Sequence, residues 1–180
     1  MDLDGCVIVT GMPGAGKSTV SALAAELLPR AARIKGDDVR YMILSGRVRF
    51  DGEPVEAARQ GELTTRNLCA LANNFVDFGF TVFMDTLVSG RAKLDLLREL
   101  LAPRPVRLVV LAPGVEVCRH RNATRRASER VEFDGYERLN ATMHAALAGP
   151  GWWFDTSALT PEETAVRLVA ELGRRPTLAG

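Results

Sequence analysis

Apolar and polar positions divide this chain into short apolar runs separated by longer segments with helical periodicity. Such alternation is typical of βα units stacked around a mostly parallel sheet, so we expect an α/β fold. Five runs are predicted to be strands: Cys6–Thr10, Ala32–Lys35, Thr81–Met84, Val106–Ala112 and Trp152–Asp155. The fourth is the most continuous apolar run in the chain, which indicates a central strand covered on both faces.

Helices are predicted between these strands from apolar residues three or four positions apart and from residue types that begin or end helices. The expected segments are about Lys17–Leu28, Asp37–Leu44, Pro54–Phe78, a Ser89 cap to Leu101, a helix after Pro113 that carries Arg119 to Arg130, one from Asp134 and one from Thr160. In the longest, one apolar stripe is predicted to face the core: Leu68, Leu71, Ala72, Phe75 and Val76. Capping boxes are predicted for Asp134 with Glu137 and for Thr160 with Glu163.

Composition and charge narrow the class of protein. With 180 residues, 47% hydrophobic and 25% charged, the chain is expected to form one globular domain over 1–180, with 175–180 as a frayed tail. The net charge of +1 provides no global attraction to nucleic acid or to an anionic membrane. The three cysteines form no CxxC pair, and no apolar run approaches the roughly 18 residues of a membrane span. We therefore expect a cytoplasmic protein without a zinc site, a disulfide framework or a membrane segment; the oligomeric state stays open.

The most specific motif is GMPGAGKS at Gly11–Ser18, which matches GxxxxGK[ST] in full between a predicted strand and a predicted helix. Glycines let successive backbone N–H groups point at phosphates, and the start of the helix adds its positive end. The expected nucleotide contacts are Gly11, Pro13, Gly14, Ala15, Gly16, Lys17, Ser18 and Thr19. Lys17 is expected to reach the β- and γ-phosphates, and the Ser18 hydroxyl to bind Mg²⁺.

Two acidic positions follow predicted strands at the edge where a parallel sheet binds its ligand. Asp37 and Asp38 come after the second strand, and a carboxylate there can accept the proton of an attacking hydroxyl. Asp37 could instead cap the next helix. Arg40 is placed to bind an anionic substrate group or the transferred phosphoryl. Asp85 is expected to support Mg²⁺, the alternative being a plain turn aspartate.

Arginines cluster after the fourth predicted strand. Arg121 and Arg125 are four residues apart, as are Arg126 and Arg130, so two cationic rows are expected on the helix and the loop after it. A solvated surface could carry such rows. In this position we favour a lid whose arginines, Arg121 and Arg125 first, close over the triphosphate.

Four segments together, GMPGAGKST, GDDVR, MDT and HRNATRR, carry a family resemblance. They resemble the P-loop kinase group that includes chloramphenicol phosphotransferase-like enzymes, zeta-toxin-type kinases and the kinase domain of polynucleotide 5′-kinases. The resemblance spans Cys6 to about Leu172. It implies a P-loop NTPase fold with the sheet order of nucleoside-monophosphate kinases and an arginine-rich lid. It also implies that Asp37 is the base, with Arg40 three residues on, and that the loop containing Thr156 touches adenine.

These features predict a kinase that uses ATP and Mg²⁺ to phosphorylate a hydroxyl of a small molecule. Leu87 stands where polynucleotide kinases have asparagine, so a 5′-hydroxyl kinase of nucleosides or oligonucleotides is the second hypothesis. A third is an ATP-binding switch module that transfers nothing. No NKxD segment occurs, which disfavours a guanine-specific switch. We expect 45–53 and the helix from Pro54 to form the wall of the acceptor pocket.

Overall fold

In the computed structural model, residues 3–49, 52–127 and 130–178 are described, and within them five strands form one parallel sheet. The strands are β1 (Cys6–Thr10), β2 (Ala31–Lys35), β3 (Thr81–Asp85), β4 (Val106–Leu111) and β5 (Trp152–Phe154). Their order is β2-β3-β1-β4-β5, so the phosphate-loop strand β1 lies in the middle. Every residue of β1 is buried, and Cys6 pairs with Val82 of β3 and Val106 of β4.

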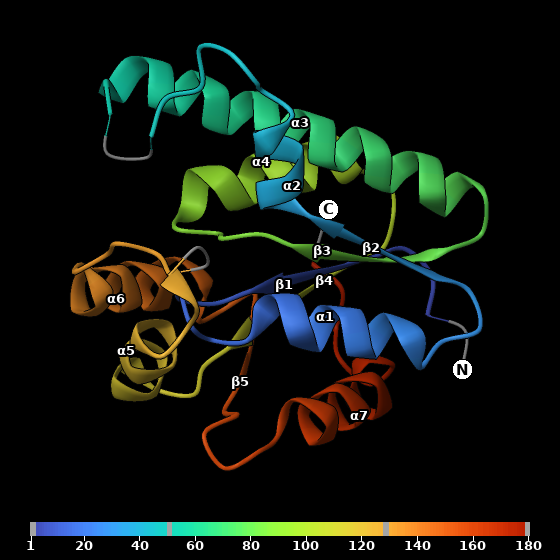
Figure 1. Cartoon of the computed structure of the whole chain (residues 1–180). Coiled ribbons are helices and arrows are strands. Elements are labelled where there is room, and N and C mark those ends of the chain that lie inside the picture. Colours follow the sequence, from blue (N-terminus) through green and yellow to red (C-terminus); the bar gives the residue numbers. More distant parts are fainter. Residues whose placement is uncertain (1–2, 50–51, 128–129, 179–180) are drawn as a thin grey trace.

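Helices cover both faces of the sheet. They are α1 (Lys17–Glu26), α2 (Gly36–Tyr41), α3 (Pro54–Asp77), α4 (Arg91–Leu101), α5 (Val115–Ala123), α6 (Tyr136–Leu147) and α7 (Pro161–Leu172). Figure 1 shows α1 and α7 below the sheet and α3 and α4 above it. The start of α3, together with α5 and α6, lies at the left, where β1 leads into α1. The carboxyl ends of the strands are therefore flanked by α2–α3 on one side and α5–α6 on the other.

Several expectations from the sequence are confirmed. All five strands occur within one residue of the predicted bounds, and the sheet is parallel with helices on both faces. The capping box of α7 is present: Thr160 Oγ1 accepts from the Glu163 backbone N–H at 3.1 Å, and Glu163 Oε2 accepts from the Thr160 N–H at 2.8 Å. No described helix has the length and apolar character needed to cross a membrane.

The predicted capping box at Asp134 is wrong. Helix α6 begins at Tyr136 after Gly135, and no side chain caps it. Glu137 instead forms an ion pair with Arg119 of α5, so its carboxylate is not available to the preceding backbone. The predicted Ser89 cap is also displaced, because α4 begins at Arg91 after Gly90.

The arginine-bearing helix is shorter than predicted. Helix α5 ends at Ala123, so Arg126 and Arg130 are not on one helical row. The Asn122 side chain joins the end of α5 to the backbone of Val131. Its Nδ2 donates to the Val131 carbonyl at 2.7 Å, and its Oδ1 accepts from the Val131 N–H at 3.1 Å. This pairing favours a turn over a continued helix. Residues 128–129 lie outside the described part of the chain.

The core stripe of α3 is rotated from its predicted position. Leu68 and Ala72 are buried as expected, but Leu71 is 36% exposed to solvent and Phe75 is 39% exposed. The buried residues at 65, 68, 69 and 72 still follow helical spacing. Thr65 and Cys69 thus take the places in the stripe that were predicted for Leu71 and Phe75. At the other end of the chain, where a frayed tail was expected, the Leu178 N–H donates to the Val106 carbonyl at 2.7 Å. Residues 179–180 are outside the described range.

Candidate active site

The phosphate loop connects β1 to α1 and depends on glycine at its centre. Gly14 has φ +85°, and a Cβ there would lie 2.1 Å from the Cys118 carbonyl oxygen of α5. Only glycine accepts both that backbone angle and that approach. The loop is thereby packed directly against the helix that leads into the arginine segment. Of the other expected contacts, Ala15 is buried, Pro13 is half-buried and Thr19 is exposed.

Lys17 lies across this loop. Its Nζ donates to the carbonyls of Gly11 at 2.9 Å and Met12 at 3.1 Å. Burial lowers the pKa of Lys17, while the carboxylates of Asp85 and Asp37 oppose that shift and the Arg125 guanidinium adds to it. These electrostatic effects mean that the fold brings charges from α1, α2, β3 and the arginine segment to one place.

Asp85, at the end of β3, is the centre of a buried hydrogen-bond network. Its Oδ2 accepts from Ser18 Oγ at 2.6 Å and from Arg33 Nη2 at 3.1 Å. Arg33 Nε in turn donates to Ser21 Oγ at 3.2 Å. The two predicted magnesium ligands are therefore adjacent. Arg33 was not identified from sequence, since only the pairing of β2 with β3 brings it beside Asp85.

The donor set fits a magnesium ion. A hydroxyl and a carboxylate are hard oxygen ligands, and Mg²⁺ commonly takes one or two protein oxygens with phosphate and water completing the octahedron. Among the described residues there is no group of three or more His, Cys, Asp or Glu that could hold a metal. An ion at Ser18 and Asp85 would accordingly draw its other ligands from nucleotide and water.

The two neighbouring aspartates of α2 have different surroundings. Asp38 is 3.5 Å from Lys35 Nζ, in an ion pair on the outer side of the site. Asp37 acts electrostatically on Lys17 and on Lys93. Helix α2 begins at Gly36 and no side chain caps it, which contradicts the alternative that Asp37 is a helix cap.

Arg40 is buried beneath the segment after α2. Its Nη2 donates to the Val48 carbonyl, and Gln60 of α3 holds the same segment from the other side. Gln60 Oε1 accepts from the Val48 N–H at 3.0 Å, and Gln60 Nε2 donates to the Gly46 carbonyl at 2.8 Å. The chain before α3 is thus fixed between two helices. Sequence reasoning missed Gln60, which carries no motif of its own.

The predicted lid arginines differ in their contacts. Arg121 and Arg125 are half-buried, and Arg125 affects both Lys17 and Tyr136. Arg126 is exposed, and Arg119 forms ion pairs with Glu116 and Glu137. Arg125 is consequently the arginine of this segment with an electrostatic link to the phosphate-loop lysine.

Lys93 of α4 is a further charged group at this edge, and sequence reasoning missed it. Its Nζ donates to Thr86 Oγ1 at 3.2 Å. Burial lowers the pKa of Lys93 to about 8, against an ordinary 10.5, with Asp37 and Cys69 opposing the shift and Arg40 adding to it. The available signal in the sequence was a lysine in the first turn of the helix that follows Asp85 and Thr86.

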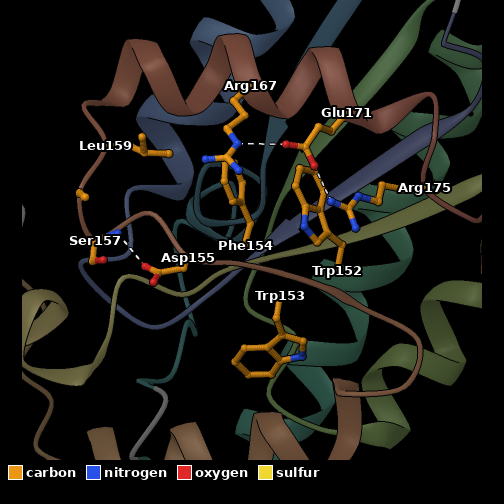
Figure 2. Close-up of a pocket in the computed structure, with 10 residues that line it drawn as sticks. Trp152, Trp153, Phe154, Asp155, Ser157, Leu159, Arg167, Glu171 and Arg175 are labelled. Atoms are coloured by element: carbon orange, nitrogen blue, oxygen red, sulfur yellow. Dashed lines mark hydrogen bonds and ion pairs between the residues drawn. The ribbon is translucent and has the colours of Figure 1, made fainter.

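The loop after β5 borders a separate pocket. Figure 2 shows this pocket between Trp152, Phe154 and the ion pairs that Glu171 of α7 forms with Arg167 of the same helix and with Arg175, which follows the helix. The pocket has a volume of about 370 Å³. No residue of the phosphate loop lines it. The indole of Trp152 stacks on Phe154, and both residues belong to β5. Thr156 is buried, and its Oγ1 has no hydrogen-bond partner among the described residues.

Comparison with known proteins agrees with this geometry. Residues 6–150 match a protein family described as an AAA domain. A sugar kinase from Janibacter sp. HTCC2649 is similar in structure with a TM-score of 0.71, 20% identity and 97% of each chain covered. APS kinase from Mycobacterium tuberculosis, solved with AMPPNP and APS, has a TM-score of 0.71 and 21% identity over 94% of this chain and 98% of that one.

A tunicamycin resistance protein from Deinococcus radiodurans has a TM-score of 0.68 and 19% identity over 99% of both chains. A search of curated proteins gave no significant match. The parallel sheet with β1 at its centre is a fold that this chain shares with that sugar kinase and that APS kinase. The family match covers most of the chain, and this protein belongs to the AAA domain family.

Proposed function

We propose that this protein is a phosphotransferase that moves the γ-phosphoryl group of ATP, with Mg²⁺, to a hydroxyl of a small molecule. The observation that carries the proposal is the convergence of Lys17, Asp37, Asp85 and Arg125 at the carboxyl edge of the sheet. Similarity in fold to a sugar kinase and to APS kinase supports it. A nucleotide-binding switch has no need for a second carboxylate, Asp37, whose charge acts on the phosphate-loop lysine.

Each residue has a distinct task in this reaction. Asp37 accepts a hydrogen bond from the acceptor hydroxyl and takes its proton as the oxygen attacks the γ-phosphorus. A bond forms between that oxygen and phosphorus, the bond to the β,γ-bridging oxygen breaks, and ADP leaves with the electron pair. Lys17 and Arg125 place positive charge where negative charge develops. Mg²⁺, when bound at Ser18 and Asp85, supplies charge neutralisation of the phosphates.

Arg40 and Gln60 contribute indirectly, by fixing the chain from 46 to 48 between α2 and α3. That segment follows α2, the helix that carries Asp37, and is proposed to form one wall of the acceptor site. Thr156 and the loop after β5 are proposed to approach the adenine ring. Arg121 would join Arg125 in the lid.

The proposal is tested by incubating the protein with γ-labelled ATP and a panel of sugars, sugar acids, antibiotics, nucleosides and 5′-hydroxyl oligonucleotides. For the acceptor found, Asp37→Asn is expected to lower kcat by about 10²- to 10⁴-fold, the usual contribution of a positioned base, with nucleotide affinity unchanged. Asp38→Asn is the matched control, because Asp38 is paired with Lys35, and its kcat should change less than about 3-fold.

A larger loss for Asp38→Asn would assign the base to Asp38. Equal and small losses for both variants would remove base catalysis from α2. Labelling confined to oligonucleotides would replace the small-molecule acceptor with a nucleic-acid one, and nucleotide binding without any labelled product would favour the switch module.

A further inference from the structure

Lys93 is a half-buried ammonium group without a countercharge in contact with it among the described residues. Its Nζ has one hydrogen bond among the described residues, to the neutral hydroxyl of Thr86 at 3.2 Å, and no ion pair. The first turn of α4, which carries Lys93, contains no acidic residue. Removing an ammonium group from water without a paired anion is unfavourable, and an anionic ligand that reaches the group offsets that penalty.

The surroundings of Lys93 connect it to the proposed base. Thr86 follows β3 directly, and a Cβ on Gly36 would lie 3.2 Å from the Thr86 hydroxyl oxygen. The Lys93–Thr86 pair is therefore packed against the residue that immediately precedes Asp37. Asp37 favours the charged form of Lys93 without forming an ion pair with it. The Asp37 carboxylate, which would take the proton, and the Lys93 ammonium are therefore neighbours with separate roles.

Further cationic side chains lie at the same edge. Burial lowers the pKa of Arg40, the Arg47 guanidinium adds to that shift, and Arg40 also acts on Lys93. Asp37 is the carboxylate that acts on both Arg40 and Lys93. Asp85 is occupied by Ser18 and Arg33, and Asp38 by Lys35. Asp85 and Asp38 are thus engaged with other groups, and neither pairs with Lys93.

We infer that the acceptor carries an anionic group, a carboxylate or a phosphate or sulfate ester, and that Lys93 binds it so that the acceptor's hydroxyl reaches Asp37. This inference rests on the proposed function and specifies its substrate class. The lowered pKa of Lys93 agrees with it, because the group is held at low solvation until an anion arrives. A structural lysine that only supports Thr86 would not respond to anions.

The chain has three lysines, Lys17, Lys35 and Lys93, which makes a direct test possible. Protein labelled with carbon-13 at lysine Cε gives three NMR signals, assigned with Lys35→Met and Lys93→Met. The full-length protein is first saturated with AMPPNP and Mg²⁺, which the Lys17 signal reports. It is then titrated at constant ionic strength with sodium sulfate, sodium gluconate or the uncharged polyol glucitol.

We expect the Lys93 signal to move and saturate with sulfate, with gluconate or with both, and to stay in place with glucitol. The sulfate and gluconate arms distinguish an ester-type anion from a carboxylate. Equilibrium dialysis with the anion that binds should show about 10- to 100-fold weaker affinity in Lys93→Met, the range for losing a charge-assisted hydrogen bond. Lys93→Arg should restore affinity, and Lys35→Met, a matched loss of one lysine, should retain it.

A Lys93 signal that moves with neither anion, while Lys17 responds to AMPPNP, would overturn the anionic acceptor and leave the proposed kinase function standing. An equal response to glucitol would also overturn it. A Lys17 signal indifferent to AMPPNP would contradict the proposed function, whereas a saturable anion response at Lys93 in the same sample would still support the anion site. Unchanged anion affinity in a folded Lys93→Met protein would assign Lys93 a structural role.

Discussion

The network at Asp85 is expected to stabilise the fold independently of its proposed role in binding Mg²⁺. Asp85 Oδ2 accepts from Ser18 and from Arg33, and the Asp85 side chain is only 4% exposed, against 27% for Arg33. In Asp85→Asn the arginine loses its countercharge in a half-buried place. Breaking a fully buried pair costs about 3–5 kcal/mol, and water reaches Arg33 here, so we expect about 2–3 kcal/mol.

A double-mutant cycle with Arg33→Met isolates the pair, because methionine keeps the aliphatic stem and removes the charge. The losses of unfolding free energy in the two single variants should add up to more than the loss in the double variant, and the difference, the coupling energy, should be about 1–2 kcal/mol. For a domain of this size, Asp85→Asn should lower Tm by about 4–12 °C, at roughly 2–4 °C per kcal/mol. Thermal and urea unfolding measure both quantities.

Asp95→Asn is the control for this cycle. Asp95 pairs with Arg91 on the surface of α4, where both side chains are at least half exposed, and such pairs contribute less than about 1 kcal/mol. Additive losses in the Arg33–Asp85 cycle, or an Asp85→Asn protein as stable as the wild type, would refute the argument that this ion pair supports the sheet edge. Loss of activity without loss of stability would leave only the metal-binding role.

Three further predictions follow from named contacts. Gly14→Ala should abolish nucleotide binding measured by calorimetry, because its Cβ would collide with the Cys118 carbonyl. The control Gly149→Ala should bind nucleotide normally, because a Cβ there has no atom within 4 Å. Tight binding by the Gly14 variant would show that the loop can rearrange. Arg125→Ala should lower kcat more than it weakens ATP affinity, because negative charge builds up on the phosphoryl group in the transition state. Arg126→Ala is the control, because Arg126 is exposed. Equal losses in rate and binding would describe a ground-state contact. Burial puts the pKa of Lys93 at about 8 against 10.5, so the unfolded chain binds more protons between these values. Stability of the wild type relative to Lys93→Met should therefore rise with pH in that window, by at most about 1.4 kcal/mol per unit, and a constant difference in urea unfolding would contradict the shift.

Local signals were sufficient for the elements whose contacts lie close in sequence. Thr160 and Glu163 are three residues apart, so their capping box depends on one helical turn and was predicted correctly. The same spacing failed at Asp134, because Glu137 found a stronger partner, Arg119, eighteen residues away along the chain. A local motif is reliable only where no distant group competes for the same atoms.

The candidate site divides in the same way. Lys17 and Ser18 were identified from sequence because a phosphate loop is a continuous segment whose glycines, lysine and serine have the required spacing. Asp37 and Asp85 were identified because each lies within two residues of the end of a predicted strand. Their assembly around Lys17 agrees with that reading.

Only the tertiary structure assigned places to Arg33, Gln60 and Lys93. Arg33 meets Asp85 through the pairing of β2 with β3, and Gln60 holds the segment before α3 by bonds to backbone atoms. Neither Arg33 nor Gln60 belongs to a recognisable sequence motif. The sequence by itself determined the α/β order of elements and the phosphate loop, because periodicity and contiguous spacing express short-range geometry. Which charges share a buried edge was decided by the packing of α2, α3 and α4 against the sheet, because burial and electrostatic coupling depend on distances between segments far apart in the chain.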